Sequence, residues 1–116
     1  MKSLTEIINE HALADTIESQ YDGAEINLYE KNNKITLSKI VIPKKLRGQG
    51  IGSEIMNKLC KYADDNNKTI ILTPSVDFGA SSVNRLKSFY KSFGFVINAG
   101  KNKDFEISNS MYRLPK

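Results

Sequence analysis

Residues 46–54, LRGQGIGSE, constrain the fold of this chain more than any other segment. The segment places three glycines between an apolar run, ITLSKIVIP, and IMNKLCKYA, whose apolar residues recur at helical spacing. A glycine inside a helix or strand costs roughly 0.5–1 kcal/mol relative to alanine. The three glycines therefore predict a turn between a strand and a helix, at which the chain needs a backbone without side chains.

Apolar periodicity predicts the elements around this turn. Helices are expected over residues 3–19, 51–66 and 83–93. Strands are expected over residues 24–30, 34–42, 69–73, 95–98 and 110–115, and the segment KNN joins the first two in a hairpin. The order α-β-β-α-β-α-β-β is typical of an α/β or α+β sandwich with helices packed on one mixed sheet.

Length and composition set further limits. A chain of 116 residues suits one domain over residues 1–116, and no apolar run approaches the roughly 18 residues that span a membrane. Cys60 is the only cysteine, so a reducing, cytoplasmic setting is expected. Histidine, cysteine and acidic residues show no metal-ligand spacing, so no metal is expected. Neither Cys60, on an apolar helix face, nor the lone His11 is expected to be catalytic.

Charge is unevenly distributed. Residues 1–30 hold one lysine against seven acidic residues, whereas residues 31–116 hold 16 basic and 6 acidic residues. A basic body of this kind suits an anionic ligand, either a phosphorylated cofactor or a nucleic acid. A solvated lysine-rich surface is the alternative interpretation.

A glycine-rich turn that opens a helix is a recurrent anion site. The first N–H groups of a helix lack internal partners, and the helix dipole places about half a positive charge there. Glycine lets these N–H groups approach phosphate oxygens closely. Two nucleotide motifs are excluded, because Ser53 rather than a P-loop lysine follows Gly52 and G-x-G-x-G is not the dinucleotide fingerprint. A tight turn without a ligand is the alternative.

The pattern Arg47-x-x-Gly50-x-Gly52 resembles the R/Q-x-x-G-x-G/A signature of the GNAT superfamily of N-acetyltransferases. IVIPKKLRGQGIGSEIM is similar to the strand-to-helix segment that carries this signature, and RLKSFYKSFGFV is similar to a later helix-to-strand segment of the family. The tail KNKDFEISNSMYRLP resembles short members carried by phages and mobile elements. The resemblance implies a GNAT-like mixed sheet, truncated at the N-terminus.

The resemblance also implies acetyl-CoA as the co-substrate and assigns site residues. The turn and the helix start would bind the pyrophosphate of coenzyme A through Arg47, Gly48, Gln49, Gly50, Ile51, Gly52 and Ser53. The pantetheine arm and the thioester oxygen would be held by the backbone N–H groups of Ile40, Val41 and Ile42. Tyr90 would protonate the departing thiolate, since a phenol of pKa about 10 can donate to a thiol of pKa about 8.5. The alternative role of Tyr90 is core packing.

Acyl transfer to an amine also needs a base. A lysine-type amine has a pKa of about 10.4, so its neutralisation at neutral pH costs about 4.6 kcal/mol. The strand expected over residues 34–42 carries no carboxylate. The sequence does not choose among the remaining candidates, Glu25, Glu30, Asp77 and Glu106.

The expected function is acetyl-CoA-dependent transfer of an acetyl group to a primary amine. Only about 23 residues precede the first expected strand, which leaves the acceptor side open and favours a macromolecular acceptor, a protein lysine or N-terminus. The alternative is a non-enzymatic GNAT-fold protein that binds a host protein or nucleic acid. Direct nucleic-acid binding ranks last, since the sequence lacks interleaved aromatic residues and known binding motifs. A homodimer is left open, and no membrane partner is expected.

Overall fold

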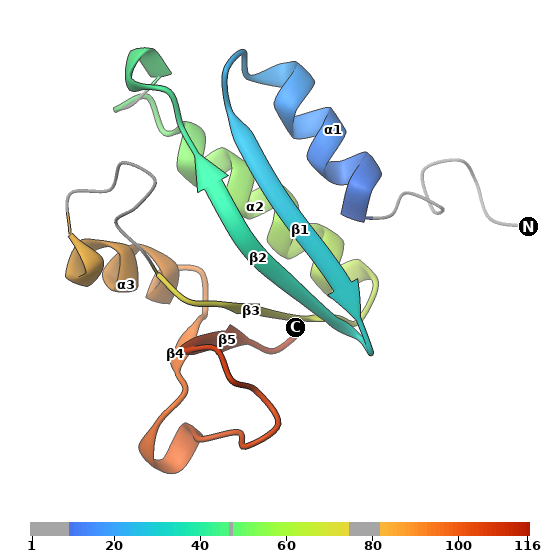
Figure 1. The fold of residues 1–116 in the computed structure, drawn as a ribbon, viewed down its shortest axis with the longest axis vertical. Helices are drawn as coiled ribbons and strands as arrows, with labels where there is room; N and C mark the ends of the chain where they lie inside the picture. Colours follow the sequence, from blue (N-terminus) through green and yellow to red (C-terminus); the bar gives the residue numbers. More distant parts are fainter. Residues whose placement is uncertain (1–9, 47, 75–81) are drawn as a thin grey trace, which may run out of the picture.

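The computed structural model describes residues 10–46, 48–74 and 82–116 (Figure 1). The described helices are α1 (Glu10–Gln20), α2 (Ile51–Asp65) and α3 (Val83–Lys91), with short 3₁₀ turns at Lys44–Leu46 and Gly100–Asn102. The described strands are β1 (Glu25–Lys31), β2 (Lys34–Val41), β3 (Thr69–Leu72), β4 (Val96–Ile97) and β5 (Met111–Arg113). The predicted α/β class and element order are confirmed, whereas β4 and β5 are shorter than predicted. Residues 3–9 of the first expected helix lie outside the described residues.

The five strands form one mixed sheet in the order β1-β2-β3-β5-β4. β2 and β3 are parallel, and the other neighbouring strands are antiparallel. The β1–β2 hairpin turns through Asn32 and Asn33, whose φ angles of 52° and 64° lie in the left-handed region that asparagine tolerates. The KNN segment therefore forms the predicted turn.

β3 pairs with the first half of β2 only. Their pairing ends at Leu37 and Leu72, whereas β2 continues to Val41. The register between β1 and β2 shifts at Ser38, whose Oγ donates a hydrogen bond of 3.3 Å to the carbonyl of Asn27. The last part of β2 thus keeps β1 as its neighbour and diverges from β3 (Figure 1).

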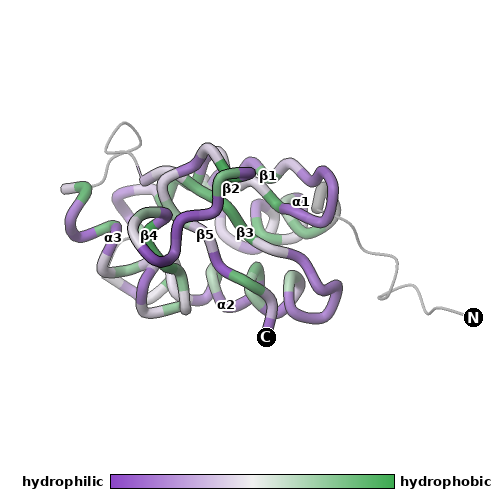
Figure 2. Tube along the Cα trace, turned by 90° about the horizontal axis from the view of Figure 1, so that it is seen from below, coloured by the Kyte–Doolittle hydropathy of each residue, from purple (hydrophilic) through white to green (hydrophobic). Residues whose placement is uncertain are grey.

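One cluster of buried side chains joins the helices to the sheet. In α2 the buried residues are those of the predicted apolar stripe, Ile55, Met56, Leu59, Cys60 and Ala63. Figure 2 shows α2 along one face of the sheet, with β1 and β2 on the opposite side of the molecule. Buried residues of β1 alternate with exposed ones such as Tyr29, which is 59% exposed. In the described ranges, therefore, no helix covers the outer face of β1.

An ion pair ties the C-terminal strand to α2. Arg113 is buried and donates two hydrogen bonds to the Asp64 carboxylate, at 2.8 and 3.1 Å. Arg113 Nε also donates to the carbonyl of Phe93 at 2.7 Å, and Lys116 N donates to Asp64 Oδ1 at 2.9 Å. The hydrogen bonds from Arg113 hold the pKa of Asp64 below its ordinary value.

The buried side chain of Asn98 organises the loop between β4 and β5. Its Nδ2 donates to the carbonyls of Ile107 and Asn109 at 2.9 and 3.0 Å. Its Oδ1 accepts a hydrogen bond of 2.7 Å from Asp104 N. These side-chain hydrogen bonds hold the loop that follows β4, and β4 ends at Ile97, one residue earlier than predicted. The loop presents Phe105 to solvent, with 89% of the side chain exposed.

Candidate cofactor-binding site

The glycine turn lies between the end of β2 and the start of α2. Gly48 and Gly50 have φ angles of 80° and 75°, in the left-handed region that favours glycine. Among the described residues, a Cβ atom at either position would meet no atom within 4 Å. The left-handed backbone rather than crowding therefore requires these glycines, and the described part of the chain leaves space for a ligand beside them.

The first turn of α2 presents backbone donors to this space. Gly50 is the N-cap residue, and no side chain caps the helix. The Gly50 carbonyl accepts the first helical hydrogen bond, from Glu54 N at 3.0 Å. The first N–H groups of the helix have no intrahelical partner and carry the positive end of the helix dipole. The turn and the helix start together meet the requirements of an anion-binding site.

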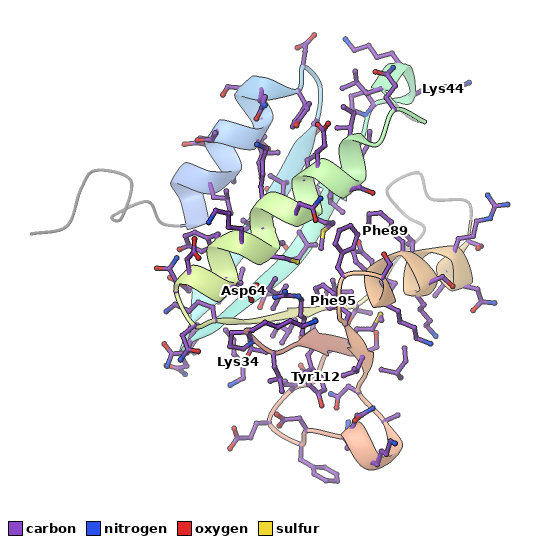
Figure 3. The ribbon with its side chains drawn as sticks, turned by 180° about the vertical axis from the view of Figure 1, so that it is seen from behind. Lys34, Lys44, Asp64, Phe89, Phe95 and Tyr112 are labelled. Atoms are coloured by element: carbon purple, nitrogen blue, oxygen red, sulfur yellow. The ribbon has the colours of Figure 1, made fainter. Side chains whose placement is uncertain are left out.

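Basic side chains flank the glycine turn. Lys44 and Lys45 are exposed, and Lys44 lies beside the turn (Figure 3). Lys45 Nζ forms an ion pair of 3.1 Å with Asp22. Gln49 Nε2 donates to the carbonyl of Lys45 at 3.1 Å and links the turn to the preceding residues. Arg47, a predicted site residue, lies outside the described residues.

The backbone at the end of β2 alternates in direction. Ile26 N donates a hydrogen bond of 3.0 Å to Glu18 Oε2, so the backbone groups of Ile26 point away from β2. Residues paired directly across an antiparallel ladder point their backbone groups the same way relative to each other, both inward or both outward. The backbone N–H and C=O of Ile40, the partner of Ile26, therefore point away from β1, toward the edge of β2 that β3 pairs with only as far as Leu37. Val41, one residue further, faces β1. Ile40 is thus well oriented to bind an extended ligand, while the side chains of Ile40 and Ile42 pack against the core.

Tyr90 lies in an aromatic cluster on the buried side of α3. It is 5% exposed, and its ring contacts Phe89 and Phe95 at centroid distances of 5.4 and 5.6 Å. Burial raises the pKa of Tyr90, so the phenol is protonated at neutral pH. Phe89 extends the cluster to α2, since a Cβ atom at Gly52 would lie 3.6 Å from Phe89 Cζ. The structure therefore links Tyr90 to the start of α2 through Phe89, which the sequence pattern did not reveal.

The candidate bases are engaged or exposed elsewhere. Glu25 Oε2 forms an ion pair of 2.7 Å with a lysine of β2. Glu30 is ion-paired beside the hairpin turn, at the opposite end of β2 from the glycine turn. Glu106 is exposed on the β4–β5 loop, and Asp77 lies outside the described residues. The described geometry therefore singles out none of these carboxylates.

Cys60 has potential chemistry but lies away from this arrangement. Cys60 is buried on α2, and burial raises the pKa of its thiol. The side chain of His11 lies outside the described residues. Within the described ranges, no three histidine, cysteine or acidic residues are grouped so that they could hold a metal ion. None of the helices in this part of the chain has the length and apolar character needed to cross a membrane.

Comparison with known sequences identifies the family. A sequence profile described as GCN5-related N-acetyl-transferase matches residues 14–78, which is more than half of the chain. The chain therefore belongs to the GCN5-related N-acetyltransferase family, the GNAT family whose signature its glycine turn resembles. No curated protein matches the sequence.

Solved structures share the fold. An acetyltransferase of the GNAT family from Staphylococcus aureus Mu50 is 23% identical and superposes with a TM-score of 0.58 over 80% of this chain. Ard1 from Thermoplasma volcanium is 21% identical, with a TM-score of 0.58 over 99% of this chain and 85% of its own. The chain spans 60% of the Staphylococcus protein, which is less than two thirds of its length.

Proposed function

We propose that this protein is an acetyl-CoA-dependent N-acetyltransferase that acts on primary amines. One observation carries the proposal: Gly48 and Gly50 hold an open, left-handed turn at the uncapped start of α2. A diphosphate needs several N–H donors within reach and no side chains in its way. A Cβ at either glycine would project into the space that the diphosphate needs, so the residues present fit this ligand.

The proposed path of acetyl-CoA follows the end of β2. Its diphosphate lies against residues 48–53, with Lys44 and Arg47 contributing positive charge. Its pantetheine arm then runs along β2, where the backbone of Ile40 faces away from β1. The end of the β2–β3 pairing at Leu37 and Leu72 supports this path, because among the described strands none pairs with this side of β2 beyond Leu37 and an extended chain can add to such an edge through backbone hydrogen bonds.

The proposed reaction is attack of the acceptor's amine nitrogen on the thioester carbon. A C–N bond forms and the C–S bond breaks, while the amine loses a proton to a base and the thiolate of coenzyme A takes one. Tyr90 is the proposed proton donor, since its buried phenol is protonated at neutral pH. The base is unassigned, and the candidates are Glu25, Glu30, Asp77 and Glu106.

We further propose that the acceptor amine belongs to a macromolecule, as a protein lysine or N-terminus. No described helix covers the outer face of β1, so a large acceptor can approach β2 from that side (Figure 2). The β4–β5 loop adds an exposed aromatic side chain, Phe105, of a type enriched at protein interfaces.

Native mass spectrometry and calorimetry with acetyl-CoA test the co-substrate, and labelled acetyl-CoA in a cell lysate tests the transfer. We expect the protein to bind acetyl-CoA and to label one or a few protein bands. Failure to bind acetyl-CoA would overturn the proposal, and binding without transfer would favour a non-enzymatic binding protein. Label confined to small metabolites would overturn the macromolecular acceptor.

A further inference from the structure

The turn between α1 and β1 contacts the chain on both sides of the glycine turn. Tyr21 Oη donates a hydrogen bond of 2.6 Å to Glu54 Oε2, in the first turn of α2. The next residue, Asp22, forms its ion pair of 3.1 Å with Lys45, just before the glycine turn. These contacts join segments that lie far apart in the sequence.

Gly23 makes a third contact by close packing. Its φ angle is 88°, and a Cβ atom there would stand 2.9 Å from Pro43 Cγ, which is too close for an L side chain. Ala24 N donates to the carbonyl of Tyr21 at 2.9 Å, so residues 21–24 form a closed turn rather than a loose loop. Three consecutive residues of this turn therefore hold the end of β2, the start of the glycine turn and the start of α2.

We propose that residues 21–23 are a positioning element, here called the clasp, that fixes the glycine turn for the diphosphate of acetyl-CoA. This inference rests on the proposed function. Among the described residues, a Cβ at Gly48 or Gly50 would touch nothing, so these two glycines are not held in place by surrounding side chains. Glycine also loses more conformational freedom on ordering than any other residue. Contacts at both ends restrict the turn before the ligand arrives, which strengthens binding.

The hydrogen bond from Tyr21 also controls a negative charge. Glu54 lies in the first turn of α2, where a free carboxylate would repel a bound diphosphate. Tyr21, which follows α1, donates its hydrogen bond to this carboxylate, whereas the position of a Cβ atom on Gly52 lies beside Phe89 of α3. Helix geometry places Glu54 and Gly52, two residues apart, on nearly opposite sides of α2. The hydrogen bond from Tyr21 then holds the Glu54 carboxylate on its own side, where it is less free to turn toward a bound diphosphate.

Two substitutions of Glu54 isolate the hydrogen bond from the charge. Glu54→Ala and Glu54→Gln both remove the charge, but only glutamine keeps an oxygen that can accept from Tyr21. We expect the Kd for acetyl-CoA to be about 2- to 10-fold higher in Glu54→Ala than in Glu54→Gln, as for the loss of one hydrogen bond. In a Tyr21→Phe background the two substitutions should give equal Kd values, because the donor is gone.

Tyr21→Phe alone should raise the Kd and KM for acetyl-CoA about 2- to 10-fold and leave kcat unchanged, since the turn binds a part of the molecule that does not react. Tyr29→Phe is the matched control, because Tyr29 is an exposed tyrosine of β1 that takes no part in the clasp. Circular dichroism verifies that each variant is folded. If the unmodified protein binds acetyl-CoA tightly but Glu54→Ala and Glu54→Gln have equal Kd values, the proposed role of the clasp is overturned. The proposed function would then be unaffected. An unmodified protein that does not bind acetyl-CoA would instead overturn the proposed function.

Discussion

Phe89 Cζ lies 3.6 Å from the position that a Cβ atom on Gly52 would occupy. Gly52 stands in the first turn of α2 and Phe89 in α3, so this contact joins the helix of the proposed diphosphate site to the helix of the proposed proton donor. Phe89 also meets Tyr90 and Phe93 edge-on, at centroid distances of 5.4 and 5.1 Å. A side chain introduced at Gly52 would therefore affect both the proposed diphosphate site and the packing of the aromatic cluster.

Gly52→Asp should abolish acetyl-CoA binding while the protein stays folded. Gly52 does not have a left-handed φ, so an L residue suits its backbone. An acidic side chain in the first turn of a helix is favourable by about 0.3–1 kcal/mol. The same charge repels a diphosphate. Calorimetry should show no binding, and circular dichroism should show that the variant is folded.

Gly52→Ala is the control for this prediction. Its Cβ would make an ordinary contact with Phe89, and alanine is favoured over glycine in a helix by about 0.8–1 kcal/mol. We therefore expect a more stable protein that loses much less affinity than the aspartate variant. Unchanged affinity in a folded Gly52→Asp protein would place the diphosphate elsewhere.

Acid should destabilise the protein in part through Asp64. Hydrogen bonds from Arg113 lower the pKa of Asp64 in the folded state below its ordinary value of 3.8. A carboxyl group of this kind stabilises the fold above its unfolded-state pKa and loses that contribution as the pH falls through the folded-state pKa. The free energy of unfolding should therefore decrease below about pH 4.

Asp64→Asn tests this assignment. The variant leaves the buried guanidinium of Arg113 without its counter-charge, which should cost about 3 kcal/mol at neutral pH. Its stability should then decline less steeply with acid than that of the unmodified protein. Urea titrations at neutral and acidic pH measure both quantities, and parallel pH profiles would show that Asp64 is not responsible.

Asn98→Asp should loosen the β4–β5 loop without disturbing α2. The substitution keeps the size and the acceptor oxygen but removes the Nδ2 donor, which serves the carbonyls of Ile107 and Asn109. Each buried group left unpaired costs about 1–3 kcal/mol. Hydrogen exchange should accelerate across residues 99–110 and stay slow in α2. Asn27→Asp on the exposed face of β1 is the control, and unchanged exchange in the loop would refute the role of Asn98.

Local rules explain the part of the fold that the sequence predicted. The glycine turn, the asparagines of the hairpin and the apolar stripe of α2 each depend on the preferences of neighbouring residues. The element order followed from the same preferences. The GNAT-like signature then indicated which of these elements carries the proposed anion site.

Local sequence patterns did not predict the side-chain contacts between segments that are distant in the sequence. Arg113 and Asp64 lie 49 residues apart, and Tyr21 and Glu54 lie 33 apart. Nothing in the local pattern distinguishes these four residues from solvated polar residues of the surface. Their pairing depends on how the helices are placed on the sheet. Asn98 was predicted as a strand end for the same reason, since its partners belong to a loop that folds back on it.

Tyr90→Phe separates the catalytic and structural roles of Tyr90. Phenylalanine keeps the ring, and hence its contacts with Phe89 and Phe95, but lacks the hydroxyl. If the hydroxyl donates the proton to the departing thiolate, kcat should fall by about 10²–10⁴, the usual contribution of a positioned acid. The affinity for acetyl-CoA should barely change, because the hydroxyl acts as the thiolate forms.

The competing role of Tyr90 gives a different result in the same measurements. A tyrosine that only packs in the core should lose at most about 0.5–1.5 kcal/mol of unfolding free energy with its hydroxyl, and kcat should stay at the unmodified value. Chemical denaturation and steady-state kinetics on the one variant therefore distinguish the two roles. A folded Tyr90→Phe protein with unchanged kcat would assign protonation to water. The proposed transferase function would stand in that case, because it depends on the turn at Gly48 and Gly50 rather than on this hydroxyl.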